Sequence, residues 1–213
     1  MSLLPPAPPE VLAPGLVLHR GWFDRSAQSD LVETLRVALG LAPLFTPVMP
    51  RTGKPFSVRM TNLGPLGWVS DEQGYRYQSD HPVTHQAWPP IPEILLMAWD
   101  TLANFTQPPE ACLVNVYQGK AKMGLHQDRD EKEFAAPVLS VSLGDTCLFR
   151  FGGNKRNDPT RSIRLESGDV LVMGGPSRLC FHGVDRIEAG SSDLLAKGGR
   201  INLTLRRVTP AKD

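Results

Sequence analysis

The segment GLHQDRD contains residue types that bind metal ions, because His126 and Asp128 stand two positions apart. A His-x-Asp pair is weak evidence by itself, since chance often supplies one in a chain of ordinary composition. A second histidine, His182, stands in the late apolar segment CFHGV, whose composition predicts a β-strand. Two imidazoles and one carboxylate with open coordination sites are typical of non-haem Fe(II) oxygenases, although such ligands also bind catalytic zinc. The three residues therefore predict a metal site, with iron and zinc as alternatives.

The segment RINLTLR indicates what fills the open coordination sites. It alternates as a β-strand, and one of its faces carries Arg200, Asn202, Thr204 and Arg206. Buried guanidinium groups are strongly disfavoured unless they meet anions, and a dicarboxylate satisfies both arginines. An Fe(II) enzyme that uses 2-oxoglutarate requires this combination, whereas zinc hydrolysis has no use for it. The alternative is an exposed strand with two surface arginines.

Strands that could position these residues follow residue 110. Short segments rich in Val, Leu and Phe are separated by turn residues, and they read CLVNVYQ, PVLSVSLG, TCLFRFGG, RSIRLESG, DVLVMGG, RLCFHGV and RINLTLRRV. Strands at this spacing predict a two-sheet sandwich or jelly roll. In a jelly roll, strands that are distant in sequence lie close together. We therefore expect His126, in a Gly-containing turn after the first strand, to meet His182.

Two amphipathic helices are expected outside the sheets. The first begins near Ser29, with Asp30 and Glu33 as a capping pair. The second begins near Pro92 and runs through IPEILLMAWDTLANF. Residues 41–91 between them are rich in Pro, Gly and aromatic residues and show little periodicity. They predict a long irregular insertion, which in compact domains is usually a functional lid or disordered.

Composition places the chain among soluble globular proteins with one domain, residues 1–213. Residues 1–16 are rich in proline and predict an extended arm. The sequence shows no membrane segment and no secretory signal, so a cytoplasmic protein is expected. Cys112, Cys147 and Cys180 form no CxxC pair and are expected to be reduced core residues.

The net charge of +1 argues against a protein that coats nucleic acid. The stretch from Arg150 to Arg164 nevertheless has a local excess of positive charge. It predicts either a solvated hairpin or an edge that contacts phosphates.

The order and spacing of several motifs resemble the bacterial branch of the AlkB family of Fe(II)/2-oxoglutarate dioxygenases. The motifs are MTNLGPLGW, QGYRY, LVNVY, LHQDRDE, FGG, KRNDP and GDV, followed by the late histidine and R-x-N-x-T-x-R. They cover about residues 50–207. The resemblance implies a mainly β fold with flanking helices (α+β). It further implies a double-stranded β-helix (jelly-roll) core over about residues 111–208 and a nucleotide-recognition lid over about residues 41–91.

The resemblance also implies an activity and a role for each site residue. The activity is oxidative demethylation of N-alkylated bases, such as 1-methyladenine and 3-methylcytosine, in single- or double-stranded DNA or in RNA. Iron would be bound by His126, Asp128 and His182. The co-substrate 2-oxoglutarate would be bound through its carboxylates by Arg200 and Arg206, with hydrogen bonds from Asn115, Tyr117 and Asn202. The base pocket would be lined by Met60, Trp68 and Tyr75, with Asp130, Glu131 and Arg156 near the substrate.

Other functions fit part of the pattern. An oxygenase of this type could act on methylated RNA, a protein side chain or a small metabolite. A metal-free module could recognise modified nucleic acid without reacting, and a zinc hydrolase could use the same three ligands. The aromatic lid and the basic stretch favour nucleic acid, while the intact ligands and arginines disfavour a non-catalytic reader. We expect a monomer without a protein partner or a membrane association.

Overall fold

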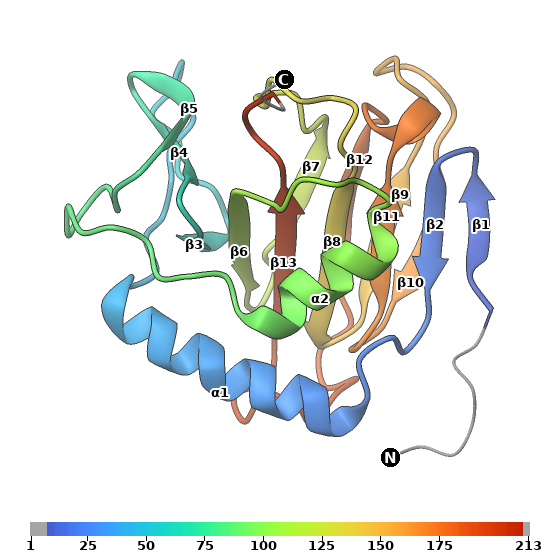
Figure 1. Cartoon of the computed structure of the whole chain (residues 1–213), viewed down its shortest axis with the longest axis horizontal. Helices are drawn as coiled ribbons and strands as arrows, with labels where there is room; N and C mark the ends of the chain where they lie inside the picture. The colour runs from blue at the N-terminus through green and yellow to red at the C-terminus, as the bar shows by residue number, and fades with distance from the viewer. Residues whose placement is uncertain (1–7, 211–213) are drawn as a thin grey trace.

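The computed structural model describes residues 8–210, and its centre is a pair of antiparallel β-sheets (Figure 1). Of strands β6 to β13, four belong to each sheet, in the jelly-roll arrangement that was predicted. The larger sheet contains β6 (Ala111–Tyr117), β8 (Val138–Gly144), β11 (Val170–Met173) and β13 (Arg200–Arg206). The smaller sheet contains, in spatial order, β10 (Arg161–Leu165), β9 (Cys147–Phe151), β12 (His182–Ile187) and β7 (Met123–His126).

Apolar side chains fill much of the space between the sheets, because successive residues of a strand point to opposite faces. Val138 and Leu171 from the larger sheet join one buried cluster with Phe149 and Val184 from the smaller sheet. The three cysteines are free and buried, as predicted. Polar side chains that enter this interior therefore need a specific reason to be there.

Strand β7 was not predicted from the sequence, which placed His126 in a turn. Its four residues include Gly124 and no β-branched residue, so local composition does not indicate a strand. It pairs with β12 at the edge of the smaller sheet, and His126 is its last residue. Pairing with a distant strand therefore decides the conformation of this segment.

Strands from the N-terminal half extend the larger sheet at both edges. Its order is β1-β2-β11-β8-β13-β6-β3, with β1 at Glu10–Ala13, β2 at Leu16–His19 and β3 at Arg59–Leu63. The prediction of an extended arm over residues 1–16 is wrong for its second part, because β1 pairs with β2 through a tight Pro14–Gly15 turn. Gly15 has φ +79, which suits glycine at this point of the turn. Residues 1–7 of the predicted arm lie outside the described residues.

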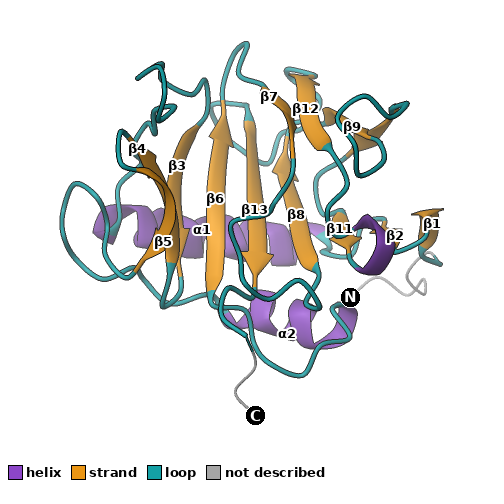
Figure 2. Ribbon diagram, turned by 90° about the horizontal axis from the view of Figure 1, so that it is seen from above, coloured by secondary structure: helices purple, strands orange, loops and turns teal. Residues whose placement is uncertain are grey.

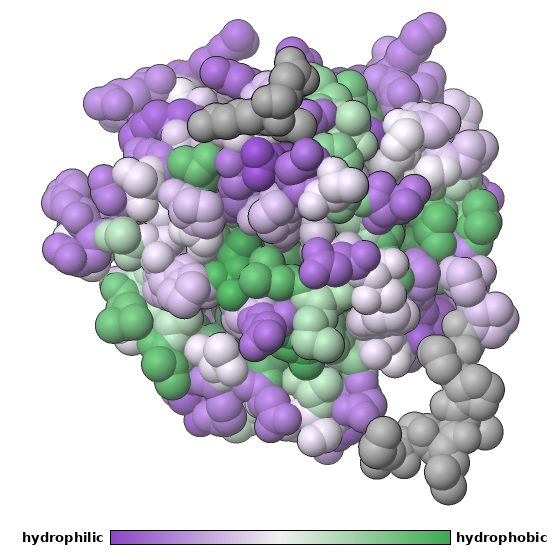
Figure 3. All heavy atoms as spheres, in the orientation of Figure 1, coloured by the Kyte–Doolittle hydropathy of each residue, from purple (hydrophilic) through white to green (hydrophobic). Residues whose placement is uncertain are grey.

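Both predicted helices cover the outer face of the larger sheet (Figures 1 and 2). Helix α1 (Arg25–Leu41) begins before the predicted Ser29, because Asp24 caps it by accepting from the Ala27 N–H at 2.9 Å. The predicted Asp30/Glu33 capping pair is therefore wrong. Helix α2 (Glu93–Leu102) follows Pro92 as predicted. Hydrophilic residues dominate the surface on this side, around a small apolar area (Figure 3).

The insertion between the helices is more regular than predicted. Besides β3 it contains β4 (Gly67–Asp71) and β5 (Gly74–Gln78), which form an antiparallel hairpin beside the edge of the larger sheet (Figure 1). The strands are too short for sequence periodicity to reveal them, and pairing with each other and with β6 supplies their hydrogen bonds. Within residues 8–210, no helix has the length and apolar character needed to cross a membrane.

Candidate active site

Strands β7 and β12 bring two histidines together. His126 and His182 are directly opposite partners in this strand pair, and their ring centroids are 4.5 Å apart. Each ring places Nδ1 beside the carbonyl oxygen two residues earlier, at 2.8 Å for Gly124 and 3.0 Å for Cys180. A carbonyl beside Nδ1 accepts from Nδ1–H, and a neutral ring of this tautomer presents an unprotonated Nε2, the form that binds a metal.

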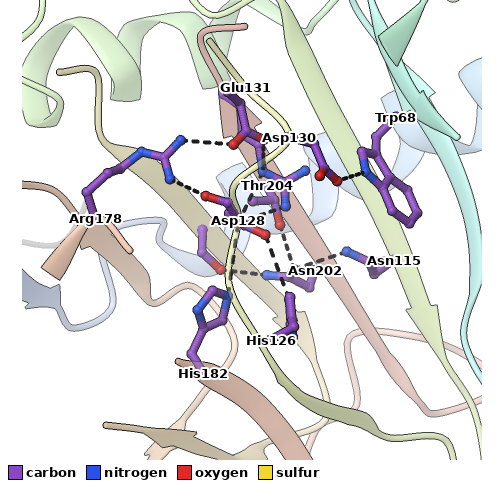
Figure 4. A network of polar contacts seen from close by, with 12 residues as sticks. Trp68, Asn115, His126, Asp128, Asp130, Glu131, Arg178, His182, Asn202 and Thr204 are labelled. Carbon is purple, nitrogen blue, oxygen red and sulfur yellow. Dashed lines mark hydrogen bonds and ion pairs between the residues drawn. The ribbon is translucent and has the colours of Figure 1, made fainter. Parts of the chain in front are cut away.

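The carboxylate of Asp128 lies beside both imidazoles (Figure 4). Asp128 Oδ1 is 3.7 Å from His126 Nε2, and Oδ2 is 4.0 Å from His182 Nε2. Burial lowers the pKa of His182 to about 4, so this ring is neutral near pH 7. Burial by itself would raise the pKa of Asp128, but Arg206 and the two histidines hold it well below its usual range. The group therefore offers two imidazole nitrogens and an anionic oxygen, all within 4.8 Å of one another.

Arg200 is a buried cation without a carboxylate partner among the described residues. Its Nη2 donates to Ser142 Oγ at 2.7 Å, whereas Nε and Nη1 have no hydrogen-bond partner. Arg200 is only 1% exposed, so these N–H groups need an acceptor within the cavity. A carboxylate has the geometry to accept from two of them at once. Beside Arg200, burial raises the pKa of Tyr117, so its hydroxyl stays protonated. Asn115 Oδ1 is also buried without a partner.

Two residues of strand β13 that were predicted to bind 2-oxoglutarate also have partners within the protein. Arg206 donates to Asp128 Oδ2 from Nε at 3.1 Å and from Nη2 at 2.8 Å, so its charge is already paired. Asn202 donates from Nδ2 to Ser140 Oγ at 2.7 Å and to the Val141 carbonyl at 3.1 Å. Both hydrogens of this amide therefore have acceptors within the protein, and the hydrogen bond from Asn202 to 2-oxoglutarate stays a prediction. Its side chain links strand β13 to strand β8 at the cavity.

Aromatic residues of the β4–β5 hairpin line the same cavity as the metal-binding group. Trp68 stacks on Tyr75 with ring centroids 5.6 Å apart and an interplanar angle of 18°. The Trp68 indole Nε1–H donates to Asp130 Oδ2 at 2.8 Å (Figure 4). This bond joins the hairpin to the loop that carries Asp128. Met60, from β3, lies deeper and is 1% exposed.

A single cavity of about 1090 Å³ collects these groups. It is lined by every site residue that the sequence predicted, namely Met60, Trp68, Tyr75, Asn115, Tyr117, His126, Asp128, Asp130, Glu131, Arg156, His182, Arg200, Asn202 and Arg206. Histidines and carboxylate, unpaired guanidinium and stacked aromatic rings therefore share one space. This is large enough for a small dicarboxylate and a planar ring together.

Known proteins share this arrangement over nearly the whole chain. A family model described as the 2OG-Fe(II) oxygenase superfamily matches residues 15–206. The chain is 54% identical over 205 residues to the alpha-ketoglutarate-dependent dioxygenase AlkB homolog of Caulobacter vibrioides, covering 96% of this chain and 93% of that protein. It is 42% identical over 203 residues to the alpha-ketoglutarate-dependent dioxygenase AlkB of Escherichia coli K12, covering 93% of each. The chain belongs to the AlkB family. A solved structure described as "The structure of OsALKBH1" has 33% sequence identity and a TM-score of 0.77, covering 94% of this chain and 100% of that one.

Fe(II) and 2-oxoglutarate are the metal and co-substrate of this AlkB-family protein. The residues present fit both groups. Two imidazoles and one carboxylate are the donor set of non-haem Fe(II) oxygenases. The unpaired N–H groups of Arg200 supply a carboxylate site that no described residue fills.

In this AlkB-family chain, Glu131 lines the cavity as predicted for a residue near the substrate, and its carboxylate also has partners within the protein. Its Oε1 accepts from the Tyr77 hydroxyl and its Oε2 accepts from Arg178 Nη2 at 3.1 Å. The residue is 5% exposed, so both carboxylate oxygens are committed to internal partners. Sequence reasoning missed Tyr77 and Arg178. The available indication was an arginine inside the otherwise apolar segment RLCFHGV.

Proposed function

We propose that the protein removes N-linked methyl groups from alkylated nucleobases in DNA by oxidative demethylation. Bases of the 1-methyladenine and 3-methylcytosine type are its substrates. One observation carries this proposal: the metal-binding group, the unpaired Arg200 and the stacked Trp68–Tyr75 pair all line the same cavity. A non-catalytic reader of modified bases would need only the aromatic rings. A cytoplasmic monomer remains the expectation from the sequence.

The metal and the co-substrate are assigned to neighbouring residues of the same cavity. His126, Asp128 and His182 would hold Fe(II) through two imidazole nitrogens and one carboxylate oxygen. Arg200 binds the distal carboxylate of 2-oxoglutarate, because its free N–H groups require an anion. Arg206 stays with Asp128 and keeps that carboxylate ionised and oriented, while its charge also attracts the second carboxylate of the co-substrate.

When bound, iron and 2-oxoglutarate supply the oxidation, in which O2 and 2-oxoglutarate give succinate and CO2 while the N-methyl group becomes N-hydroxymethyl. The N-hydroxymethyl base then releases formaldehyde, which restores the original base. No acid or nucleophile of the protein is needed for this release. The protein contributes binding and orientation, and a cavity whose interior lies between the two sheets.

The aromatic residues suit a base that has left its helix. A flipped base needs a flat apolar surface, and the exposed faces of the Trp68–Tyr75 pair offer one. Asp130 lies at the edge of Trp68, where its carboxylate favours a cationic methylated base over a neutral one. Methylated bases of this type cannot pair normally, so extruding them from a duplex costs less than extruding an intact base.

Basic residues at the cavity support a nucleic-acid strand as the substrate. The exposed cations that line it are Arg51, Lys54, Lys122, Arg129 and Arg156. Of the basic stretch identified in the sequence, only Arg156 lines the cavity. Arg150 pairs with Asp185 at 3.2 Å, and Arg164 pairs with Glu188 at 3.0 Å. Positive charge around the opening, rather than over the whole surface, fits a protein of net charge +1 that contacts a short stretch of one strand.

The direct test is turnover on a defined oligonucleotide. The purified protein is incubated with Fe(II), 2-oxoglutarate and a single-stranded DNA that contains one 3-methylcytosine, and both products are measured. We expect the oligonucleotide to lose the mass of one methylene group while succinate and formaldehyde form in equal amounts. An RNA of the same sequence, run in parallel, measures the preference between the two nucleic acids.

Two outcomes would contradict the proposal in different ways. Succinate without any change in DNA or RNA would show an oxygenase with another substrate, such as a protein or a small metabolite. Binding of the methylated strand without succinate would indicate the non-catalytic reader. A matched oligonucleotide with unmodified cytosine serves as the control for uncoupled succinate formation.

A further inference from the structure

Arg178 is a buried arginine whose whole guanidinium contacts one loop. Its Nε donates to the Ala136 carbonyl at 2.9 Å, and its Nη1 donates to the Asp128 carbonyl at 2.7 Å. Its Nη2 donates to Glu131 Oε2 at 3.1 Å. The side chain is 3% exposed, and Phe134 covers the guanidinium with its ring centroid 5.5 Å from Cζ. Figure 4 shows Arg178 reaching Asp128 and Glu131 from the side opposite Trp68.

The contacted loop carries an iron ligand but has little structure of its own. Residues 127–137, all of them described, form neither helix nor strand between β7 and β8. A backbone bond ties this loop to the end of the chain, from Lys132 N to the Val208 carbonyl at 2.8 Å. An irregular segment does not fix the direction of a carboxylate by itself. The three bonds from Arg178 supply anchors along its length.

Arg178 also belongs to the segment that leads to the other buried ligand. It directly follows the short 3-10 helix Gly175–Ser177 and stands four positions before His182. The guanidinium therefore connects the chain that carries His182 with the loop that carries Asp128. Antiparallel pairing fixes His126 against His182, but no strand pairing fixes Asp128 against either.

Four buried charged side chains surround the connection between Arg178 and the Asp128 loop. Arg178 and Arg206 are two buried cations, and they meet two buried anions, Asp128 and Glu131. Glu131 is held from the lid side by the Tyr77 hydroxyl of β5. Each of these charges has at least one partner of opposite sign in the group, and an unpaired buried charge is strongly disfavoured. Movement of the Asp128 loop would break this arrangement.

We propose that Arg178 is a positioning residue for iron, which sets the place of Asp128 relative to His182, with Glu131 as its charged partner. The proposal rests on the proposed function insofar as the three ligands bind iron. Arg178 touches neither the metal nor the substrate. It affects metal affinity by setting the positions of the three ligand atoms relative to one another, as expected for groups that orient the ligands of a metal.

Metal affinity measured without catalysis tests this role. The metal-free full chain is titrated with Mn(II), followed by electron paramagnetic resonance of the free ion, for the wild type and for Arg178→Lys. Lysine keeps the charge but cannot reach three acceptors on a plane. We expect the Kd for Mn(II) to rise by about tenfold to 100-fold, the usual range for loss of a group that orients a ligand. The absorption bands of bound Co(II), which report coordination geometry, are expected to shift.

A matched arginine distinguishes positioning from general support. Arg20 also donates to carboxylates and a carbonyl, at Glu10, Asp169 and Arg164, but it follows β2 near the β1 edge of the larger sheet and does not line the cavity. Its side chain is 33% exposed, against 3% for Arg178. Arg20→Lys is expected to reduce thermal stability without changing the Mn(II) Kd or the Co(II) bands. If Arg178→Lys folds and binds Mn(II) with the wild-type Kd and the wild-type Co(II) spectrum, the inference is wrong.

Glu131→Gln decides the question if Arg178→Lys does not fold. This variant keeps the size of the side chain and removes the charge opposite Arg178. We expect a smaller rise in the Mn(II) Kd in the same direction, and an unchanged Kd would overturn the inference. Failure of the wild type itself to bind Mn(II) would instead contradict the proposed function and the inference with it.

Discussion

His126 and His182 are cross-strand partners on β7 and β12, although they are far apart in the sequence. Their Nδ1 atoms both face backbone carbonyls, which leaves both Nε2 atoms directed at Asp128. Strand pairing thus positions two of the three ligands through the backbone. The third depends on side-chain contacts from Arg178 and Arg206.

Replacing His126 by alanine should separate metal binding from folding. This side chain is 39% exposed, so its loss should change the free energy of unfolding by no more than about 1 kcal/mol. We expect the Mn(II) Kd to rise by at least about 100-fold and demethylation to be lost, because a ligand is missing. His85→Asn is the control, since His85 is exposed and asparagine tolerates its φ of 56. Equal Mn(II) affinity in both variants would remove His126 from the metal site.

The two arginines of β13 should respond in opposite ways to replacement by methionine. Arg200→Met removes a buried charge that has no anionic partner, so we expect the stability of the ligand-free protein to be unchanged within about 1 kcal/mol or increased. Arg206→Met leaves Asp128 without its arginine and Glu131 with Arg178 as its remaining cation, and should cost about 3–5 kcal/mol. Urea unfolding of the ligand-free proteins measures both. Similar losses in the two variants would contradict this distinction.

Arg200→Met should also abolish the effect of the co-substrate. A ligand that binds only the folded state raises its stability. We expect 2-oxoglutarate with Mn(II) to raise the Tm of the wild type and to leave that of Arg200→Met unchanged. A normal shift in the variant would place the distal carboxylate elsewhere.

Asp130 should discriminate between charged and neutral lesions. Asp130→Asn keeps an acceptor for the Trp68 indole but removes the negative charge, whereas Asp130→Ala removes both. We expect Asp130→Asn to lower kcat/KM for 1-methyladenine and 3-methylcytosine by about tenfold, the effect of roughly 1.4 kcal/mol of lost attraction, and to affect neutral lesions less. Asp130→Ala should weaken both classes, with the larger loss on cationic lesions. Equal losses on both classes in the asparagine variant would exclude an electrostatic role.

Acid should destabilise the metal-free protein through His182. Its pKa is about 4 in the folded state against 6.5 normally, so between these pH values the unfolded chain binds a proton that the folded protein does not. Stability should therefore fall as the pH drops from 6.5 to 4, by on the order of 3 kcal/mol. The depressed pKa of Asp128 adds a further loss below its usual value of 3.8. Urea unfolding across this range should show a weaker pH dependence for His182→Gln, and an unchanged dependence would assign the effect to other groups.

Salt dependence should reveal a DNA strand at the cavity opening. Lys122 lines the cavity and is exposed, whereas Lys197 is exposed and does not line it. For single-stranded DNA, we expect Lys122→Gln to reduce the slope of log affinity against log salt by about 0.7, the value for one lost phosphate contact. Lys197→Gln should leave the slope unchanged. The same slope in all three proteins would contradict the proposed path of the strand.

Much of the site could be predicted from the sequence, because residue types at regular local spacing indicate which side chains share a face. Alternation in RINLTLR placed Arg200 and Arg206 on one face, and the structure directs both into the cavity. Helical spacing predicted α1 and α2, although the Asp24 cap moved the start of α1. The short strands of the lid escaped prediction, because their hydrogen bonds are made with distant partners and their length shows no period.

The sequence by itself determined the chemical types: two imidazoles and a carboxylate for a metal, arginines for a dicarboxylate and aromatic rings for a base. Only the tertiary structure decided which of these groups are already paired. Arg206 and Glu131 are occupied by buried partners, Asn202 has no free N–H, and Arg200 alone of the two β13 arginines keeps unpaired donors. The reason is physical, since a residue's type is set by the chain, whereas its partners depend on contacts between segments that are distant in sequence. Arg178 illustrates the difference most clearly, because its three acceptors belong to a loop more than 40 positions earlier in the chain.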